Sequence, residues 1–256
     1  MHYEIIDFHI HPFSDNETNV CHYKCDDMED FPSYLKGMGV SKVCGSVFCK
    51  SHPDSSPWDV VVECNRLALA LHKKYQDFYV PGIHVHPDYV QASCEEIERM
   101  HAAGVRLIGE LVPHMHGWHD YASKGFDEIL DTAAQYDMVV SIHSTNDDSM
   151  DMMIRRHPKT IFVAAHPNEY PIFLQHLERM KTNDNCYLDI SGTGLFRHRM
   201  LRYGIDACGA HRFLFGSDYP ACNPGMYIGG VAFDGLLTEE EKQLIFSGNA
   251  KRLLHL

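Results

Sequence analysis

Short apolar segments alternate with longer amphipathic segments along this chain, and this alternation restricts the possible folds more than any other feature of the sequence. Eight apolar segments are predicted strands, at residues 5–10, 40–48, 79–85, 105–111, 138–143, 160–166, 186–190 and 212–215. Predicted helices follow them at 31–37, 59–78, 94–103, 125–136, 148–157, 171–180, 196–208 and 238–254. This pattern indicates parallel strands joined by crossover helices, and eight such units predict a (β/α)8 barrel of the TIM type.

The length and composition of the chain fit a single barrel domain spanning residues 1–256. A chain of 256 residues that is 45% hydrophobic can bury a core of that size, and no linker or block of like charges divides it. The formal charge of -13 argues against a nucleic-acid partner, because nucleic-acid binders present basic patches. We therefore expect a small-molecule substrate, and the chain could also form a homo-oligomer.

No segment of the sequence has the pattern of a signal peptide or of a membrane-spanning helix. The N-terminus lacks a charged segment followed by an apolar one, and no apolar run approaches the roughly 18 residues of a membrane span. The nine cysteines are an odd number scattered through predicted strands and helices, which indicates reduced thiols. These features predict a soluble cytoplasmic protein with no membrane partner.

One short segment near the N-terminus could bind zinc on its own. Cys21, His22 and Cys25 offer two thiolates and an imidazole, but no second pair at the spacing of a structural zinc site follows them. A polar loop over the first strand is the simpler interpretation of this segment.

Two histidines, His9 and His11, end the first predicted strand. Alternate residues of a strand project from the same face, so both imidazoles can reach one metal ion. The spacing alone is weak evidence, since the chain has 19 histidines and repeats the spacing at residues 84–86 and 114–116. The first pair is distinguished by its position after an apolar strand and by candidate partners further along the chain.

Metal-ligating side chains also end other strands. In a (β/α)8 barrel the carboxyl ends of the strands meet at one face, which carries the chemistry. Imidazole and carboxylate groups of the kind that bind zinc end the predicted strands here: His9, His11, His86, Glu110, His143, His166 and Asp218. A lone histidine at a strand end is more often structural, but the joint placement of these residues predicts a metal site.

Several motifs resemble the amidohydrolase superfamily, and in particular its amidohydrolase-2 branch. They are Asp7-Phe8-His9-Ile10-His11, His143 at the end of the fifth strand, Ala164-Ala165-His166-Pro167, Phe215-Gly216-Ser217-Asp218-Tyr219-Pro220 and Asn249-Ala250-Lys251-Arg252-Leu253-Leu254. The resemblance spans nearly the whole chain. It implies a barrel with a divalent metal, usually zinc, and its implied ligands are His9, His11, His143 and Asp218.

The chemistry of these residues agrees with a hydrolytic mechanism. A divalent ion held by imidazoles and a carboxylate lowers the pKa of a bound water to about 7, so that the water can attack a carbonyl carbon. Asp218 could accept the proton of that water and pass it to the leaving group. His166 could polarise the water or stabilise the oxyanion.

Glu110 leaves the number of metal ions open. Its position at the end of the fourth strand resembles that of the carboxylate that bridges two metals in some superfamily members, and Glu110, His143 and His166 could hold a second ion. One ion is favoured, with Glu110 supporting a ligand or facing the substrate as a catalytic group, and Mn2+ or Fe2+ could replace Zn2+. No lysine ends this strand, so the carbamylated-lysine form of a two-metal site is absent.

Residues beyond these ligands are candidates for contacting the substrate. His86 ends the third strand, while His114 and His116 lie in the loop after the fourth strand, where loops of such barrels set the substrate. Arg197 follows the seventh strand and could pair with a substrate carboxylate, because a guanidinium group offers two parallel donors. The alternative for each residue is a structural or solvated side chain.

We therefore expect metal-dependent hydrolysis of an ester, lactone or amide of a small carboxylate-type substrate. The main alternative is a non-oxidative decarboxylase, since relatives in the same branch cleave carbon–carbon bonds; those acting on aromatic acids often begin with Glu-x-His, whereas this chain has His9 and His11. A TatD-like nuclease would share Glu110 and the histidines, but the net charge and the segment 111–113 weigh against it. A non-catalytic zinc-binding barrel is the remaining alternative.

Overall fold

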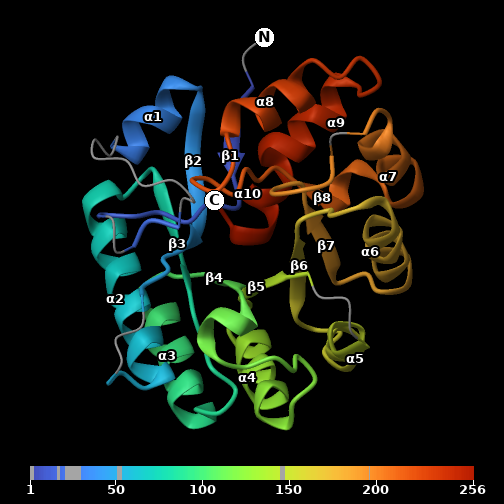
Figure 1. The fold of residues 1–256 in the computed structure, drawn as a ribbon. Coiled ribbons are helices and arrows are strands. Elements are labelled where there is room, and N and C mark those ends of the chain that lie inside the picture. Colours follow the sequence, from blue (N-terminus) through green and yellow to red (C-terminus); the bar gives the residue numbers. More distant parts are fainter. Residues whose placement is uncertain (1–2, 16–17, 21–29, 51–53, 145–147, 196) are drawn as a thin grey trace.

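The chain forms an eight-stranded parallel sheet that curls into a barrel (Figure 1). This computed structural model describes residues 3–15, 18–20, 30–50, 54–144, 148–195 and 197–256. Each strand pairs with the next one along the chain. The strands are β1 (Ile5–Asp7), β2 (Val40–Ser46), β3 (Tyr79–Ile83), β4 (Leu107–Leu111), β5 (Val139–His143), β6 (Ile161–Ala165), β7 (Cys186–Asp189) and β8 (Phe213–Leu214).

Backbone contacts beyond the ends of β1 and β8 bring the first and last strands of the sheet together. The Phe8 amide donates a hydrogen bond of 2.8 Å to the Phe215 carbonyl. Ile10 and Tyr219 then form a parallel bridge. The predicted (β/α)8 barrel is therefore confirmed, and the segments that follow β1 and β8 lie side by side.

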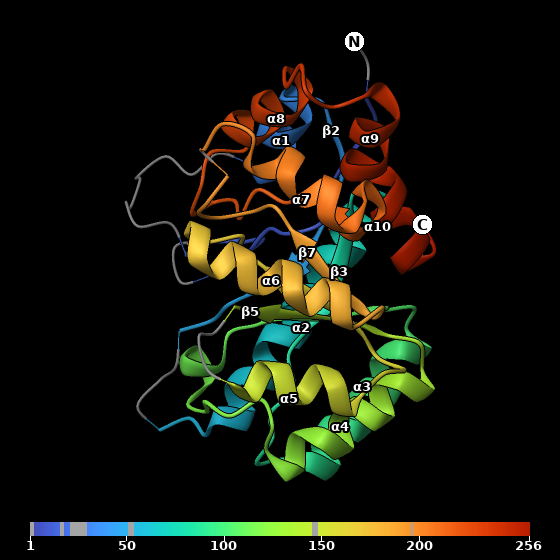
Figure 2. The ribbon, with the colours of Figure 1, turned by 90° about the vertical axis from the view of Figure 1, so that its right-hand side faces the viewer.

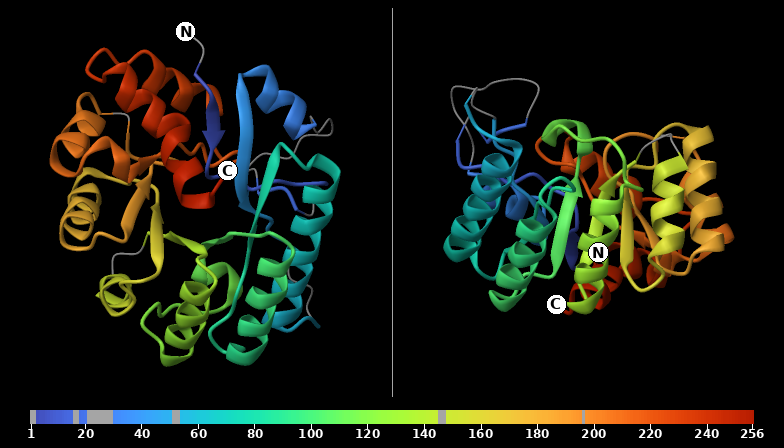
Figure 3. Two further views of the ribbon diagram at one scale, coloured as in Figure 1. Left: turned by 180° about the vertical axis from the view of Figure 1, so that it is seen from behind. Right: turned by 90° about the horizontal axis from the view of Figure 1, so that it is seen from below.

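Helices surround the strands on the outside of the barrel (Figures 1 and 2), and the view from below shows them packed around the sheet (Figure 3). They are α1 (Phe31–Gly37), α2 (Pro57–Tyr75), α3 (Val90–Ala102), α4 (Lys124–Gln135), α5 (Asp148–Arg156), α6 (Tyr170–Thr182), α7 (Met200–Cys208), α8 (Pro224–Ala232), α9 (Glu239–Gln243) and α10 (Asn249–Leu254). Short 3-10 turns lie at Pro113–His116 and Ala210–Arg212.

Local capping interactions explain where several helices begin. At the start of α2, the Ser56 hydroxyl accepts a hydrogen bond from the Asp59 amide at 3.2 Å, and the Asp59 carboxylate accepts one from the Ser56 amide at 2.9 Å. Thr238 and Glu241 form the same reciprocal pair at the start of α9. Each pair satisfies backbone donors that the first turn of a helix leaves without partners.

Three helical segments differ from the sequence-based expectation. The expected helix over 238–254 is divided, because a π-helical turn at Leu244–Gly248 separates α9 from α10. The expected helix over 196–208 begins only at Met200. Helix α8 was not predicted, because its three glycines lower helix propensity and leave no amphipathic pattern.

Two apolar clusters stabilise the barrel. Side chains that point into the barrel pack with the last helix in an inner cluster: Ile6, Phe8, Cys44, Leu107, Val139, Val163, Tyr187, Leu214, Ala250, Leu253 and Leu254. A larger cluster fills the space between the strands and the surrounding helices. Leu107 and Val139 are the first residues of their strands, so α10 packs near the amino-terminal ends. The carboxyl ends are left for polar groups.

Two further expectations from the sequence concern membrane-spanning helices and the cysteine-containing segment near the N-terminus. No helix in the described ranges is long and apolar enough to cross a membrane. The segment with Cys21, His22 and Cys25 lies outside the described residues, so its proposed zinc role stays a prediction.

Candidate metal centre

Imidazole and carboxylate groups meet at the carboxyl ends of the strands. They come from the loops after β1, β6 and β8 and from the carboxyl-terminal parts of β4, β5 and β7: His9, His11, Glu110, His143, His166, Asp189 and Asp218. Most of these side chains are buried, while Asp218 is 16% exposed and His143 is 34% exposed. The rule that strand ends share one face therefore places all of the predicted residues except His86 at this end, and the structure adds Asp189. The four ligands implied for one ion are divided, because His143 lies with Glu110 and His166 and not with His9, His11 and Asp218.

A first group of donors consists of His9, His11 and Asp218, whose ligand atoms lie within 4.8 Å of one another. The Nε2 atoms of His9 and His11 are 3.3 Å apart. Asp218 Oδ1 lies 3.4 Å from Nε2 of His11 and 3.7 Å from Nε2 of His9. Two imidazole nitrogens and one carboxylate oxygen this close together can all bind one metal ion.

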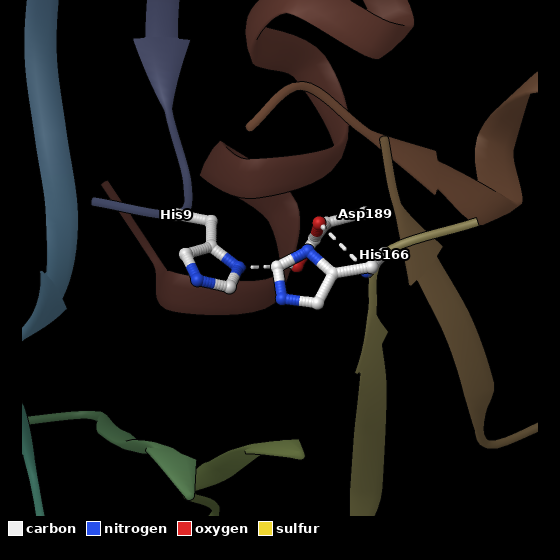
Figure 4. A group of neighbouring side chains, drawn as sticks. All are labelled: His9, His166 and Asp189. Atoms are coloured by element: carbon white, nitrogen blue, oxygen red, sulfur yellow. Dashed lines mark hydrogen bonds and ion pairs between the residues drawn. The ribbon is translucent and has the colours of Figure 1, made fainter. Parts of the chain in front are cut away.

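The other ring nitrogen of each histidine is held by a hydrogen-bond acceptor. Nδ1 of His9 lies 2.9 Å from Asp189 Oδ2, and Nδ1 of His11 lies 3.2 Å from the Ser46 carbonyl. Figure 4 shows Asp189 reaching toward His9 and His166. Since Nδ1 donates to these acceptors in the neutral ring, the Nε2 lone pair of each histidine is directed to the centre, as in histidine ligands of metals.

Glu110 lies between this first group and a second one. Its Oε2 is 3.2 Å from Nε2 of His9 and 3.4 Å from Nε2 of His11. Its Oε1 is 2.7 Å from Nδ1 of His143 and 3.3 Å from Nε2 of His166. Glu110, His143 and His166 form the second group of possible ligands. One carboxylate therefore offers one oxygen to each group.

The charges of the cluster match a divalent cation. Glu110, Asp189 and Asp218 form ion pairs only with histidines among the described residues, and no lysine or arginine there neutralises them. Three carboxylates so close together and mostly buried are costly without a cation. The donor set, with imidazole nitrogens whose lone pairs face inward, therefore fits a divalent metal.

The pKa values show how strongly these groups depend on each other. Burial alone would raise the pKa of Glu110, but the charge of His9 and hydrogen bonds with His11, His143 and His166 hold it well below its ordinary value. Burial alone would lower the pKa of His9, but the charges of Asp189 and Glu110 raise it well above its ordinary value. Without a metal, histidinium ions supply the positive charge that the carboxylates need.

Asp7 joins the two segments that carry the first donor group. Its carboxylate accepts hydrogen bonds from the Ser217 amide at 2.9 Å, the Ser217 hydroxyl at 2.5 Å and the His9 amide at 3.3 Å. Burial raises the pKa of Asp7 to about 7, although the hydrogen bonds from Ser217 oppose this shift. Asp7 therefore fixes the backbone before His9 against the backbone before Asp218.

Gly192, in the loop after β7, packs directly against His166. Its φ is +63°, and a Cβ atom at this position would lie 2.2 Å from Nδ1 of His166. We expect Gly192→Ala to lower the free energy of unfolding by about 1–3 kcal/mol and to reduce metal content, because the backbone is strained and His166 is displaced. Denaturant unfolding and metal analysis measure both effects.

Gly104→Ala is the matched control for Gly192→Ala. Gly104 has a φ of +91°, but a Cβ atom there would meet nothing within 4 Å. Gly104→Ala therefore strains the backbone without bringing a methyl group against a residue of the site. If both variants lose the same stability and keep the same metal content, the contact between Gly192 and His166 has no role in the site.

The residues expected to contact the substrate occupy different places. His86 has no free ring nitrogen, because Nδ1 accepts from the Asp88 amide at 3.2 Å and Nε2 lies 2.9 Å from the His116 carbonyl. This arrangement argues for a structural His86. His114 is exposed, and its ring centroid lies 5.9 Å from that of His143. His114 can therefore reach the mouth of the site.

His116 and Arg197 lie further from the cluster of ligands. His116 is buried, and neither ring nitrogen has a hydrogen-bond partner among the described residues. Its ring stacks on Phe48, which packs edge-on against His11 at a centroid distance of 4.8 Å. Arg197 is exposed, forms an ion pair with Glu169 and lines a separate cavity beside α7 and α8. Substrate contact stays a prediction for both residues.

Sequence reasoning missed two polar residues of the β7 segment. Asp189 holds Nδ1 of His9, and the Ser191 hydroxyl lies 3.1 Å from the same atom and 3.0 Å from Nδ1 of His166. A signal was present, since Asp189 ends a predicted strand in the same way as Glu110. The rule for strand ends, applied to the seventh strand as well, would have found it.

Known proteins match the chain at the level of family and fold. The sequence profile described as Amidohydrolase matches residues 6–256. No curated protein sequence matches the chain. Among solved structures, an uncharacterized TIM-barrel protein from Bordetella bronchiseptica is 17% identical, with a TM-score of 0.76 and coverage of 98% of each chain.

Two decarboxylases are also structurally similar to the chain. 2,6-Dihydroxybenzoate decarboxylase from Rhizobium is 14% identical, with a TM-score of 0.74 and coverage of 99% of each chain. Dihydroxybenzoic acid decarboxylase from Polaromonas, solved with bound manganese, is 15% identical, with a TM-score of 0.72 and coverage of 99% of this chain and 97% of that chain. At such identities these structures support the fold alone.

The sequence-profile match shows the family of the chain, whereas the structural matches show only its fold. It covers nearly the whole chain, and the motifs that suggested the resemblance all lie within it. The buried imidazole and carboxylate groups fit the divalent-metal site that enzymes of this family require. The chain therefore belongs to the amidohydrolase-2 family of metal-dependent enzymes.

Proposed function

We propose that this protein is a metal-dependent, non-oxidative decarboxylase of a small aromatic or unsaturated carboxylic acid. The observation that carries the proposal is the similarity, over 99% of this chain, to two decarboxylases of dihydroxybenzoic acids. This proposal departs from the hydrolysis expected from the sequence, because the named structural neighbours support the decarboxylase alternative better. A small-molecule substrate is part of the same proposal.

The reaction replaces a carboxyl group by a proton. The carbon–carbon bond breaks, CO2 leaves, the electron pair stays on the substrate carbon, and that carbon takes up a proton. A divalent ion bound by His9, His11 and Asp218 would polarise the oxygen atoms of the substrate and fix its position. The chain itself has to hold the acid in place and deliver the proton.

Asp218 is the group best placed to transfer that proton. It first has to accept the proton from water or from the substrate, because the neighbouring histidines hold its pKa below the ordinary value in spite of its burial. Its side chain is 16% exposed, whereas Glu110 is 3% exposed and Asp189 is fully buried. A substrate that enters from the mouth therefore reaches Asp218 before the other carboxylates. His143, which is 34% exposed, borders the same entrance and can orient the substrate carboxylate.

Manganese and zinc are both candidates for the ion. Imidazole and carboxylate donors suit Mn2+, Zn2+ and Fe2+, so the donor set does not choose among them. Zinc was the expectation from the family resemblance. The manganese bound in the Polaromonas decarboxylase supports testing Mn2+ first.

Hydrolysis is the second candidate, and Glu110 is the observation that favours it. Its two oxygens face two separate groups of donors, which supports positions for two ions. Two ions in such a site can hold both the attacking and the leaving oxygen of a hydrolytic reaction. His9 stands where decarboxylases of aromatic acids in the resembled branch often have a glutamate, and this difference favours hydrolysis as well.

A matched pair of substrates separates the two functions. We expect protein loaded with Mn2+ or Zn2+ to release CO2 from 2,6-dihydroxybenzoate or a related hydroxybenzoate, and to leave the methyl ester of the same acid intact. Chelation should abolish the release, and added metal should restore it. Methanol release from the ester, or ring opening of an aromatic lactone, without any CO2 would establish hydrolysis instead. An oligonucleotide in the same panel tests the nuclease alternative.

A further inference from the structure

A second cavity lies outside the barrel, away from the candidate metal centre. Its volume is about 760 Å³, and residues of α7, α8 and the loop after β7 line it. A volume of this size is within the range of small-molecule binding sites. None of the possible metal ligands lines this cavity.

The alternation of side chains along the β7 segment explains why the two sites are separate. Asp189 and Ser191 point to the centre of the barrel, where both contact His9. Ile190, between them, points the opposite way and lines the cavity. The cavity therefore lies behind the wall that carries the groups holding His9.

Part of the cavity wall is apolar, and two large apolar side chains of the lining are exposed. Met200, Leu201 and Val231 are buried residues of the lining. At the mouth, Met226 is 64% exposed and Phe233 is 81% exposed. Large apolar side chains gathered on a surface in this way mark a place where another apolar group binds.

Two arginines and a histidine line this cavity, together with one acidic residue, Asp234. Arg197, His198 and Arg199 are consecutive and all line it, in a chain whose formal charge is -13. Arg197 is neutralised by Glu169, and the lining residue Asp234 accepts a hydrogen bond from the Leu236 amide at 2.8 Å.

Arg199 is the cation that remains available. Its guanidinium forms no hydrogen bond or ion pair with any described residue, although acids outnumber bases in the chain by 35 to 22. An arginine without such a partner, next to an apolar surface, can bind a carboxylate or a sulfonate through two parallel hydrogen bonds.

We propose that this cavity is an accessory binding site for a small amphipathic organic anion. The anionic group pairs with Arg199, and an aromatic or branched apolar body packs between Met226 and Phe233 against the buried wall. The occupant is one small molecule with one negative charge and a hydrophobic body. The inference concerns a site separate from the metal centre, so it does not depend on which reaction the metal centre catalyses.

Binding of 8-anilinonaphthalene-1-sulfonate tests the proposal, since this dye is a fluorescent amphipathic anion. We expect the metal-loaded protein to bind one dye per chain, with 2-naphthoate as a competitor. Arg199 is exposed, so Arg199→Gln should leave the fold intact. It should weaken dye binding by at least about tenfold, which is the affinity that one charged hydrogen-bonding group contributes.

Gly230→Trp tests the location of the dye. Gly230 lines the cavity, and a Cβ atom there meets nothing within 4 Å, so the indole can fill the space and should abolish binding. Gly37→Trp is the matched control, because Gly37 is also helical, has equal room and lies in α1. It should bind the dye like the unmodified protein.

Three results would overturn the proposal. The first is dye binding that Gly230→Trp leaves unchanged, and the second is binding that Arg199→Gln leaves unchanged. The third is a protein that binds no dye and elutes as a dimer, together with a monomeric Gly230→Trp variant. That third result would identify the cavity as an interface between two copies of the chain.

Discussion

Asp218→Asn should lower turnover by about 10³-fold or more and should strongly reduce metal content. The substitution removes a negative charge from a point 3.4 Å from Nε2 of His11, where the cation is expected, and removes the group proposed to carry the proton. Asparagine suits the test because the φ of residue 218 is +61°, a conformation that asparagine adopts more easily than most residues. Metal analysis and turnover with the substrate identified in the panel measure the result.

Asp137→Asn is the matched control for Asp218→Asn. Asp137 also has a positive φ, of 51°, but it lies on the surface and pairs with the exposed His255. It should keep full metal content and full turnover. If Asp218→Asn also keeps its metal and no turnover depends on it, the protein is better described as a non-catalytic metal-binding barrel.

Glu110→Gln should produce the second large effect, and it addresses the number of ions. We expect the unmodified protein to bind two divalent ions per chain and the variant to bind one, because a neutral amide cannot attract both cations as the shared carboxylate does. Turnover should fall by about 10²-fold, the upper range seen when a group supporting a metal is lost. Equilibrium dialysis with Mn2+ or Zn2+ gives the stoichiometry.

Glu96→Gln serves as the control for loss of a buried carboxylate elsewhere. Glu96 is mostly buried in α3, bonds Asn65 and Arg99, and belongs to none of the groups of possible metal ligands. It should lower stability without changing the number of bound ions. If the unmodified protein and Glu110→Gln both bind a single ion, Glu110 acts through hydrogen bonds to His143 and His166 instead of bridging two metals.

These two variants also bear on the choice of reaction. Release of CO2 agrees with the decarboxylase proposal, whether the protein binds one ion or two. A protein that binds two ions and cleaves the ester agrees with hydrolysis, which the position of Glu110 favours. The product identifies the reaction, and the metal count shows whether Glu110 bridges two ions.

The sequence was a good guide to the barrel because hydrophobic periodicity is a local property. Each predicted strand overlaps an observed one, since a strand buried on both sides must be apolar regardless of its neighbours. Helix α8 escaped prediction, because its stability comes from packing and its three glycines hide any pattern. The π-helical turn at Leu244–Gly248 escaped for a similar reason, since a local sequence pattern does not reveal it.

The sequence also named most residues of the candidate site. The carboxyl ends of parallel strands share one face of a barrel, so a residue's place at a strand end was enough to group His9, His11, Glu110, His143 and Asp218. Position at a strand end does not determine which partners a side chain bonds. The rule placed His86 at the same face, yet the Asp88 amide and the His116 carbonyl occupy both of its ring nitrogens.

By itself the sequence determined that this chain is an α/β barrel with imidazole and carboxylate groups at one end. Both features can be read from short stretches of sequence, because the spacing of apolar residues marks each strand and the next residues show which side chains end it. Only the tertiary structure decided how these groups divide their contacts. Asp189, which is 180 positions from His9, holds Nδ1 of that histidine and leaves Nε2 for a metal. Glu110 has two oxygens that reach two donor groups. Such pairings depend on distances between segments far apart in the chain, which local sequence patterns do not specify.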